Sequence, residues 1–324
     1  MLFIVWYHLL LKFIVPVDDA PVYKAMYMPL HVAVICFVLI SGYFHIRPSL
    51  RGVAKLLFPL FIYYLPLTVF EMFVDGSFWR GQLFFFSKSP YWFIRVYFYL
   101  FLVSPVLNSF LVSDRRRFSL LVVLGFVAVY MGWLMRDHSM YDGKNLVLFM
   151  FLYVLGDSIR SFRKITESIG NWTIVVLYIS LNVFLVISYV TCCDSILGTI
   201  VWKLSFPYNS PVLIINSVLL FLIIGRLHFK SRVVNWLAGS VFAVYILHHQ
   251  HYVLYYLIKP FVMSVYCMIK SPLVLIMVLG MMSLAILMLF IIVDKFFLPV
   301  QNAFMKNLSK YETHIIENVR NRKK

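Results

Sequence analysis

The sequence predicts an all-α membrane protein: a polytopic bundle of about ten transmembrane helices, with both termini in the cytoplasm. The chain is 62% hydrophobic and 13% charged, and its mean hydropathy is +0.88. Apolar runs of roughly 20 residues, the length that crosses a bilayer as a helix, recur along the whole chain. Lys and Arg residues gather in every second loop, which is typical of cytoplasmic loops. We therefore expect a single membrane domain at residues 1–300 and a basic cytoplasmic tail at residues 301–324.

Each expected helix is placed by one apolar run and the polar loop that follows it. The first run resembles the apolar part of a signal peptide. No basic residues precede it and no small-residue cleavage site follows it, so we expect it to be retained. The first and sixth runs are short for a span. The expected helices cover residues 1–15, 26–44, 53–74, 91–112, 118–135, 145–159, 172–191, 211–227, 236–258 and 272–298.

The loops after the second, fourth, sixth and eighth expected helices hold most of the positive charge. Their basic residues are Arg47, Arg51 and Lys55; Arg115, Arg116 and Arg117; Arg160, Arg163 and Lys164; and Arg226, Lys230 and Arg232. This alternation is unbroken and the tail is also basic, so both termini should face the cytoplasm. The net charge of +16 then follows from membrane topology. We expect the lipid bilayer as a partner, and no nucleic acid.

Two histidines are expected deep inside the membrane. By helical rise, His8 lies roughly 10 Å from the start of its helix, and His248 lies roughly 15 Å below the outer boundary. Ionisable groups at such depths are costly and usually functional. A neutral imidazole can take a proton from a hydroxyl and return it near pH 7. Satisfaction of His8 by a neighbouring helix explains the residue equally well.

Other polar groups leave more than one interpretation open. His248 and His251 would share one face of a helix at the i and i+3 positions. We see no carboxylate that converges on them, and expect no bound metal. Glu71 and Arg95 lie at similar depth, and would either pair with each other or bind a substrate. The four cysteines contain no C-x-x-C pattern.

The stretch Phe37-Val38-Leu39-Ile40-Ser41-Gly42-Tyr43-Phe44 is the most specific signal in the chain. A small Ser-Gly pair lets two helices approach closely, which is its structural interpretation. The stretch also resembles the F-x-x-x-S-G-Y/F-L/F signature of the acyltransferase-3 family of integral-membrane O-acyltransferases. Three further segments resemble that family: Tyr91-Trp92-Phe93-Ile94-Arg95 with Ser104-Pro105-Val106-Leu107-Asn108; Ser210-Pro211-Val212 with the apolar residues 219–227; and Trp236-Leu237-Ala238 with Val244-Tyr245-Ile246-Leu247-His248.

The resemblance implies a multi-pass enzyme of the plasma (inner) membrane. It would transfer an acyl group, expected to be acetyl, from acetyl-CoA at the cytoplasmic face to a hydroxyl of a surface glycan or its lipid-linked precursor. Acetyl-CoA would be a substrate, with no permanently bound cofactor. The competing interpretation is a transporter or flippase for a glycan or acylated intermediate, although the sequence shows no inverted repeat. The oligomeric state is left open.

The resemblance also assigns roles to residues. His8 would be the base that deprotonates the acceptor hydroxyl, and His248, Arg95 and Tyr245 would stabilise or position the reacting groups. The phosphates of coenzyme A would meet the cluster of Arg47, Arg51 and Lys55, and Ser41, which precedes this cluster in the chain, would also bind the donor. Topology alone would also explain these basic residues.

The family usually opens with an Arg that precedes the first-helix His by eleven positions. His8 fits that His, but the Arg would fall before Met1. We therefore expect either that the chain starts at an internal Met or that this member does without the Arg.

Overall fold

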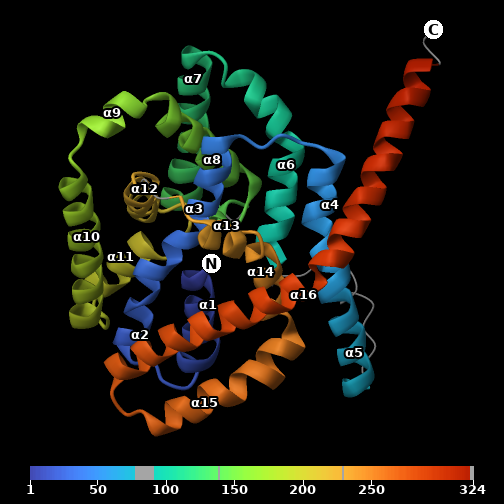
Figure 1. Ribbon diagram of the computed structural model, residues 1–324. Coiled ribbons are helices and arrows are strands. Elements are labelled where there is room, and N and C mark those ends of the chain that lie inside the picture. The colour runs from blue at the N-terminus through green and yellow to red at the C-terminus, as the bar shows by residue number, and fades with distance from the viewer. Residues whose placement is uncertain (77–90, 138, 228–229, 322–324) are drawn as a thin grey trace. The chain divides into compact units, whose positions relative to one another are not determined.

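The computed structural model describes residues 1–76, 91–137, 139–227 and 230–321, with no side chains for Asp75, Tyr141 and residues 309–321 (Figure 1). Throughout these ranges the regular structure is helical, as predicted, and contains no strand. The outer loop expected around residues 78–87 and the last three residues of the tail lie outside the described residues.

Six helices in the described residues are long and apolar enough to cross a membrane. They are Pro21–Phe44, Leu50–Val74, Trp92–Phe110, Asp114–Leu134, Asn171–Cys192 and Pro272–Leu308. Four shorter apolar helices accompany them, at Leu2–Ile14, Ile196–Ser205, Pro211–Gly225 and Val253–Met268. These helices fit a multi-pass membrane protein. The total of about ten spans and the cytoplasmic location of the termini stay predictions.

The ninth expected helix, at residues 236–258, is wrong as a single element. The structure contains α13 (Arg232–Ala238), α14 (Val241–His249) and the π-helical segment η7 (Val253–Ile258). The first break follows Gly239, a residue with low helix propensity. At the second break Gln250 is extended, and its side-chain Oε1 accepts a hydrogen bond from the Val253 N–H at 2.9 Å. This side chain ends one helix and caps the next.

Four segments expected to be loops are also helical, and the last helix is longer than expected. The four helices are α2 (Pro21–Ala25), α9 (Arg163–Ser168), α11 (Ile196–Ser205) and α15 (Lys259–Met268). The last helix, α16 (Pro272–Asn321), continues through most of the expected tail without a break.

The chain forms two compact units. Unit 1 contains Met1–Ile46, Trp92–Lys230 and Lys259–Ser283, and unit 2 contains Arg47–Tyr91, Ser231–Ile258 and Leu284–Lys324.

Unit 1 is built around α3 (Tyr27–Phe44) and α8 (Leu146–Ser161), which lie side by side in Figure 1. Glycines make this close packing possible. A Cβ atom on Gly42 would lie 2.0 Å from the Tyr153 carbonyl oxygen, and one on Gly156 would lie 2.3 Å from the Leu39 carbonyl oxygen. The Ser-Gly pair is therefore a helix-packing site, as its structural interpretation predicts.

Most other helices of unit 1 pack on one member of this pair. Its described elements are α1 (Leu2–Leu9), η1 (Leu10–Ile14), α2 (Pro21–Ala25), α6 (Trp92–Phe110), α7 (Asp114–Gly125), η5 (Phe126–Leu134), η6 (Tyr141–Gly143), α9 (Arg163–Ser168), α10 (Asn171–Cys192), α11, α12 (Pro211–Gly225), α15 and the start of α16. The buried amides of Asn182 and Asn216 exchange two hydrogen bonds at 2.9 and 3.0 Å and join α10 to α12. This exchange satisfies two amides that would otherwise be costly to bury.

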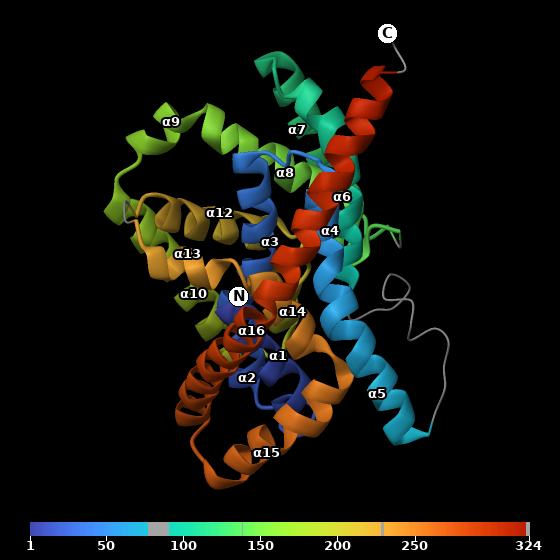
Figure 2. The same ribbon diagram turned by 45° about the vertical axis from the view of Figure 1, so that its right-hand side comes forward.

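Unit 2 contains a continuous helical stretch made of α4 (Leu50–Pro59), η2 (Leu60–Tyr64) and α5 (Leu65–Asp75), visible in Figure 2. Ser49 caps its start by accepting a hydrogen bond from the Gly52 N–H at 3.0 Å. The later part of α16 packs on this stretch. The Tyr63 hydroxyl donates to Asp294 Oδ1 at 2.8 Å, and the rings of Phe58 and Phe304 lie 5.1 Å apart.

Candidate active site

A basic pocket of about 600 Å³ lies in unit 2, between α4, the loop before α14 and α16. Its lining includes Arg51, Lys55 and Lys306, together with Asp294. Arg51 and Lys55 share a face of α4 because they are four residues apart on a helix. Asp294 is buried and accepts the hydrogen bond of the Tyr63 hydroxyl. The pocket therefore combines exposed cations at its mouth with one tethered carboxylate, an arrangement suited to a polyanionic ligand.

Of the four residues expected to bind the donor, two line this pocket. Arg51 and Lys55 line the pocket, whereas Arg47 lies exposed in the stretch before α4 and outside the lining. Ser41 lies in unit 1, where its hydroxyl bonds the Phe37 carbonyl at 2.9 Å and the Tyr97 hydroxyl at 3.0 Å. Binding of the donor by these residues stays a prediction. Lys306 was not among the expected site residues, because the helix that carries it was assigned to a separate tail.

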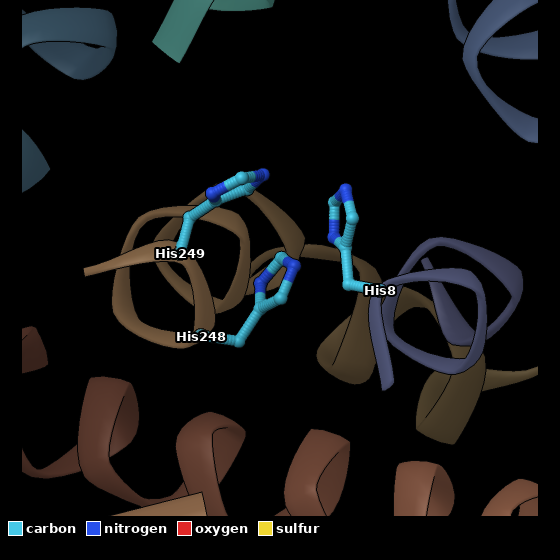
Figure 3. Close-up of side chains that lie close together, drawn as sticks. All are labelled: His8, His248 and His249. Atoms are coloured by element: carbon cyan, nitrogen blue, oxygen red, sulfur yellow. The ribbon is translucent and has the colours of Figure 1, made fainter. Parts of the chain in front are cut away.

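Two buried histidines end α14 in unit 2, and Figure 3 draws both of them. Their ring centroids lie 5.2 Å apart. The rings of Tyr91 and Tyr245 pack against His249 at 5.8 and 5.4 Å. Tyr245, expected beside His248, also contacts His248 at 5.9 Å. The wall around both imidazoles is thus largely aromatic.

One hydrogen bond determines the tautomer of neutral His248. Its Nδ1 lies 2.7 Å from the carbonyl oxygen of Val244, one helical turn earlier. A carbonyl can only accept, so Nδ1 carries the proton and Nε2 carries the lone pair. The same bond would stabilise the imidazolium after Nε2 takes up a proton. His248 is therefore equipped to act as a base through Nε2.

His8 lies on α1 in unit 1, as the sequence predicts, and Figure 3 draws its ring as well. Its side chain is partly buried, and its ring centroid lies 5.4 Å from that of Tyr7. The π-helical segment η1 begins two residues later, and such segments are frequent at functional sites. Arg95 lies partly buried on α6, also in unit 1. The predicted base and the predicted positioning histidine thus come from different units.

The structure also corrects the interpretation of the histidine run. His248 and His251 do not share a helical face, because α14 ends at His249. A carboxylate does approach the run. Buried Glu71 on α5 accepts a hydrogen bond from Gln250 Nε2 at 3.2 Å and contacts Nδ1 of His251. Glu71, for which pairing with Arg95 and binding of a substrate were both left open, contacts Gln250 and His251 within unit 2 and so holds the chain break at Gln250.

A buried ionic cluster in unit 1 was missed as well. Asp157 is fully buried, and its carboxylate binds His45 Nε2 at 2.7 Å, Arg117 Nε at 2.6 Å and Arg160 Nη2 at 2.6 Å. Arg117 was expected to serve as a topology signal, but its side chain is buried. The available signal was an aspartate inside an otherwise apolar helix. His45 directly follows α3, so its contact with Asp157 fixes the chain just after the Ser-Gly motif to α8.

Comparison with known proteins identifies the family of the chain. Residues 1–296 match the family model of an acyltransferase domain, that of the acyltransferase-3 family. No curated protein and no solved structure gave a significant match. The match covers both units up to the middle of α16. It includes His8, His248 and the part of the basic pocket that α4 forms. The chain therefore belongs to the acyltransferase-3 family of membrane acyltransferases.

Proposed function

We propose that this protein is a membrane O-acetyltransferase of the plasma membrane, which moves an acetyl group from acetyl-CoA to a hydroxyl of a surface glycan or its lipid-linked precursor. The observation that carries the proposal is the basic pocket of unit 2 in a chain of this family. Family membership supports acyl transfer in general, and the pocket supports a donor that carries several phosphates.

The pocket suits coenzyme A in both charge and size. Its volume falls within the roughly 300–1,000 Å³ of most small-molecule sites. Arg51 can bind a phosphate through two parallel N–H groups, while Lys55 and Lys306 act as point charges. Exposure of these three side chains suits a substrate that binds and leaves in every cycle, and no permanently held cofactor is required.

Acyl transfer needs a base and a way to stabilise the oxyanion. The base takes the proton of the acceptor hydroxyl as its oxygen attacks the thioester carbonyl. The tetrahedral intermediate then expels the thiolate of coenzyme A, which takes up the proton from the imidazolium. His248 Nε2 is prepared for this cycle by the Val244 carbonyl. His8 is the other candidate for the base, and Arg95 and Tyr245 would stabilise or position the intermediate.

The test of donor binding compares three single variants of the full chain in lipid nanodiscs. Arg51→Gln and Lys55→Gln should each raise the KM for acetyl-CoA, because each loses a charge-assisted phosphate contact. The expected change is about tenfold, the lower end of the ~1.5–3 kcal/mol range for such contacts, since both residues are exposed. Arg47→Gln is the matched control, because Arg47 is exposed and lies outside the pocket lining. Equal KM values in all three variants would contradict the assignment.

A transporter is the second candidate, and one observation favours it. Discontinuous helices often form transporter binding sites, and the helical stretch from α13 to η7 is broken twice. Mass analysis of surface glycan from a deletion strain separates the two functions. Exported glycan that lacks only acetyl groups supports the enzyme, whereas loss of export supports the transporter.

A further inference from the structure

A second pocket, of about 210 Å³, lies in unit 1 at the end of η5 beside α11. Its lining includes Trp133, Arg136, Lys203 and Asn209. By the expected topology both bordering segments face the outer side of the membrane. Basic residues can lie on the outer side of the membrane, but the positive-inside rule does not require them there. Arg136 and Lys203 therefore need another explanation.

Asn209 indicates that the pocket is built to bind a polar group. The residue is only 1% exposed. Its Nδ2 donates to the carbonyl oxygens of Ala128 and Met140, both at 3.2 Å, which determines the orientation of the amide. Its Oδ1 is buried without a hydrogen-bond partner among the described residues. An unpartnered buried acceptor is unfavourable, so a ligand that donates an O–H or N–H to it would be bound more tightly.

The other lining residues specify the remaining chemistry. The indole N–H of Trp133 donates to the Lys203 carbonyl at 2.9 Å, which leaves the ring to offer an apolar face. Aromatic faces pack against the C–H face of a sugar ring. Arg136 and Lys203 are exposed cations on the same lining, suited to a carboxylate or phosphate. Gly132 leaves the space beside Asn209, because a Cβ there would lie 2.8 Å from the Asn209 Nδ2.

We propose that this pocket binds an anionic sugar unit of the acceptor, with its acidic group on Arg136 and Lys203, its ring on Trp133 and a hydroxyl on Asn209. The proposal rests on the proposed function, because it names the class of acceptor that the enzyme recognises. The anionic group has two sources: the carboxylate of a sugar acid within the glycan, or the phosphate of a lipid-linked sugar.

Binding is measured on the full chain in nanodiscs by isothermal titration, without acetyl-CoA. The probes are glucuronate for a sugar acid, glucose 1-phosphate for a phosphorylated sugar, and neutral glucose. At least one anionic probe should bind tenfold or more tightly than glucose. Arg136→Gln and Lys203→Gln should each weaken that binding about three- to tenfold. Both side chains are exposed, so both variants should fold. Lys270→Gln, an exposed residue of unit 1 outside this lining, is the matched control.

The outcomes are distinct. A preference for glucuronate assigns the pocket to a glycan sugar acid, and a preference for glucose 1-phosphate assigns it to the lipid-linked precursor; either supports the proposal. Anion binding that is unchanged in both lining variants, or equal to that of glucose, overturns it. Because no donor is present, intact binding in a protein that transfers no acetyl would count against the proposed function alone. Normal transfer without binding would count against this pocket alone.

Discussion

At the scale of single residues, hydrogen bonds decide what each buried ionisable group can do. The Val244 carbonyl directs the lone pair of His248 to Nε2, and no sequence pattern shows this because it depends on a side-chain rotamer. The sequence does place both His8 and His248 on apolar helices, since position in an apolar run is enough to predict burial. Position in an apolar run does not show which of the two is the base, because that depends on the proton transfer each one performs.

Substitution by Gln separates the chemistry of the two histidines from their packing. Gln keeps hydrogen-bonding capacity at similar size but cannot titrate. The variant that lacks the base should fold normally, and its rate of acetyl transfer should fall about 10²–10⁴-fold. The KM for acetyl-CoA should change little. Steady-state kinetics of His8→Gln and His248→Gln, compared with the unsubstituted protein, measures this.

The double variant of His8 and His248 tests whether two residues from different units act together. If the two histidines act in one catalytic step, the double variant should transfer acetyl little more slowly than either single variant. If they act independently, the fold losses in rate should multiply. Near-normal turnover in His8→Gln would remove His8 from the mechanism and leave His248 as the base.

The Asp157 cluster gives a prediction about stability. Asp157→Asn removes the charge that neutralises the buried Arg117 guanidinium. Breaking a buried pair in this way costs about 3–5 kcal/mol, so the melting temperature in detergent should fall by several degrees or more. Asp114→Asn is the control, because Asp114 also pairs with Arg117 but its side chain is 79% exposed. Similar melting temperatures for the two variants would show that burial of the cluster contributes little.

At the scale of helices, the apolar runs predict most elements, and local sequence does not predict where they break. Gln250 ends α14 because its side chain bonds Glu71 on α5, far away in the chain. The length of α16 was underestimated for a related reason. A charged segment can continue a helix when one face packs on a neighbour, as Phe304 does on Phe58. Lys306, and with it one wall of the basic pocket, could not be found without that contact.

The packing of α3 on α8 is testable with alanine. In Gly42→Ala the new Cβ would meet backbone atoms of Tyr153 at 2.0 to 2.8 Å, and backbone cannot move aside as a flexible side chain can. Overpacking of this kind costs about 1–3 kcal/mol or more, so yield and melting temperature should both fall. Gly225→Ala is the matched control, because a Cβ there meets nothing within 4 Å. Equal stability of the two variants would mean that α3 and α8 lie farther apart.

At the scale of the whole molecule, the proposed chemistry depends on which side of the membrane each pocket faces. The distribution of Lys and Arg predicts that α4 begins at the cytoplasmic side, where acetyl-CoA is available, and that α11 lies at the outer side, where a glycan would be met. A reporter fused after Lys324 should accordingly read as cytoplasmic.

Cysteine labelling in intact cells tests the two faces directly. In a variant without the native cysteines, Lys203→Cys should react with a membrane-impermeant thiol reagent from outside. Lys55→Cys should react only after the membrane is permeabilised, because it would face the cytoplasm. Both side chains are exposed in the structure, so a difference in labelling reports the side of the membrane and not burial. Labelling of Lys55→Cys in intact cells would place the basic pocket outside. Cytoplasmic acetyl-CoA could not reach it there, and donor binding by Arg51 and Lys55 would have to be abandoned.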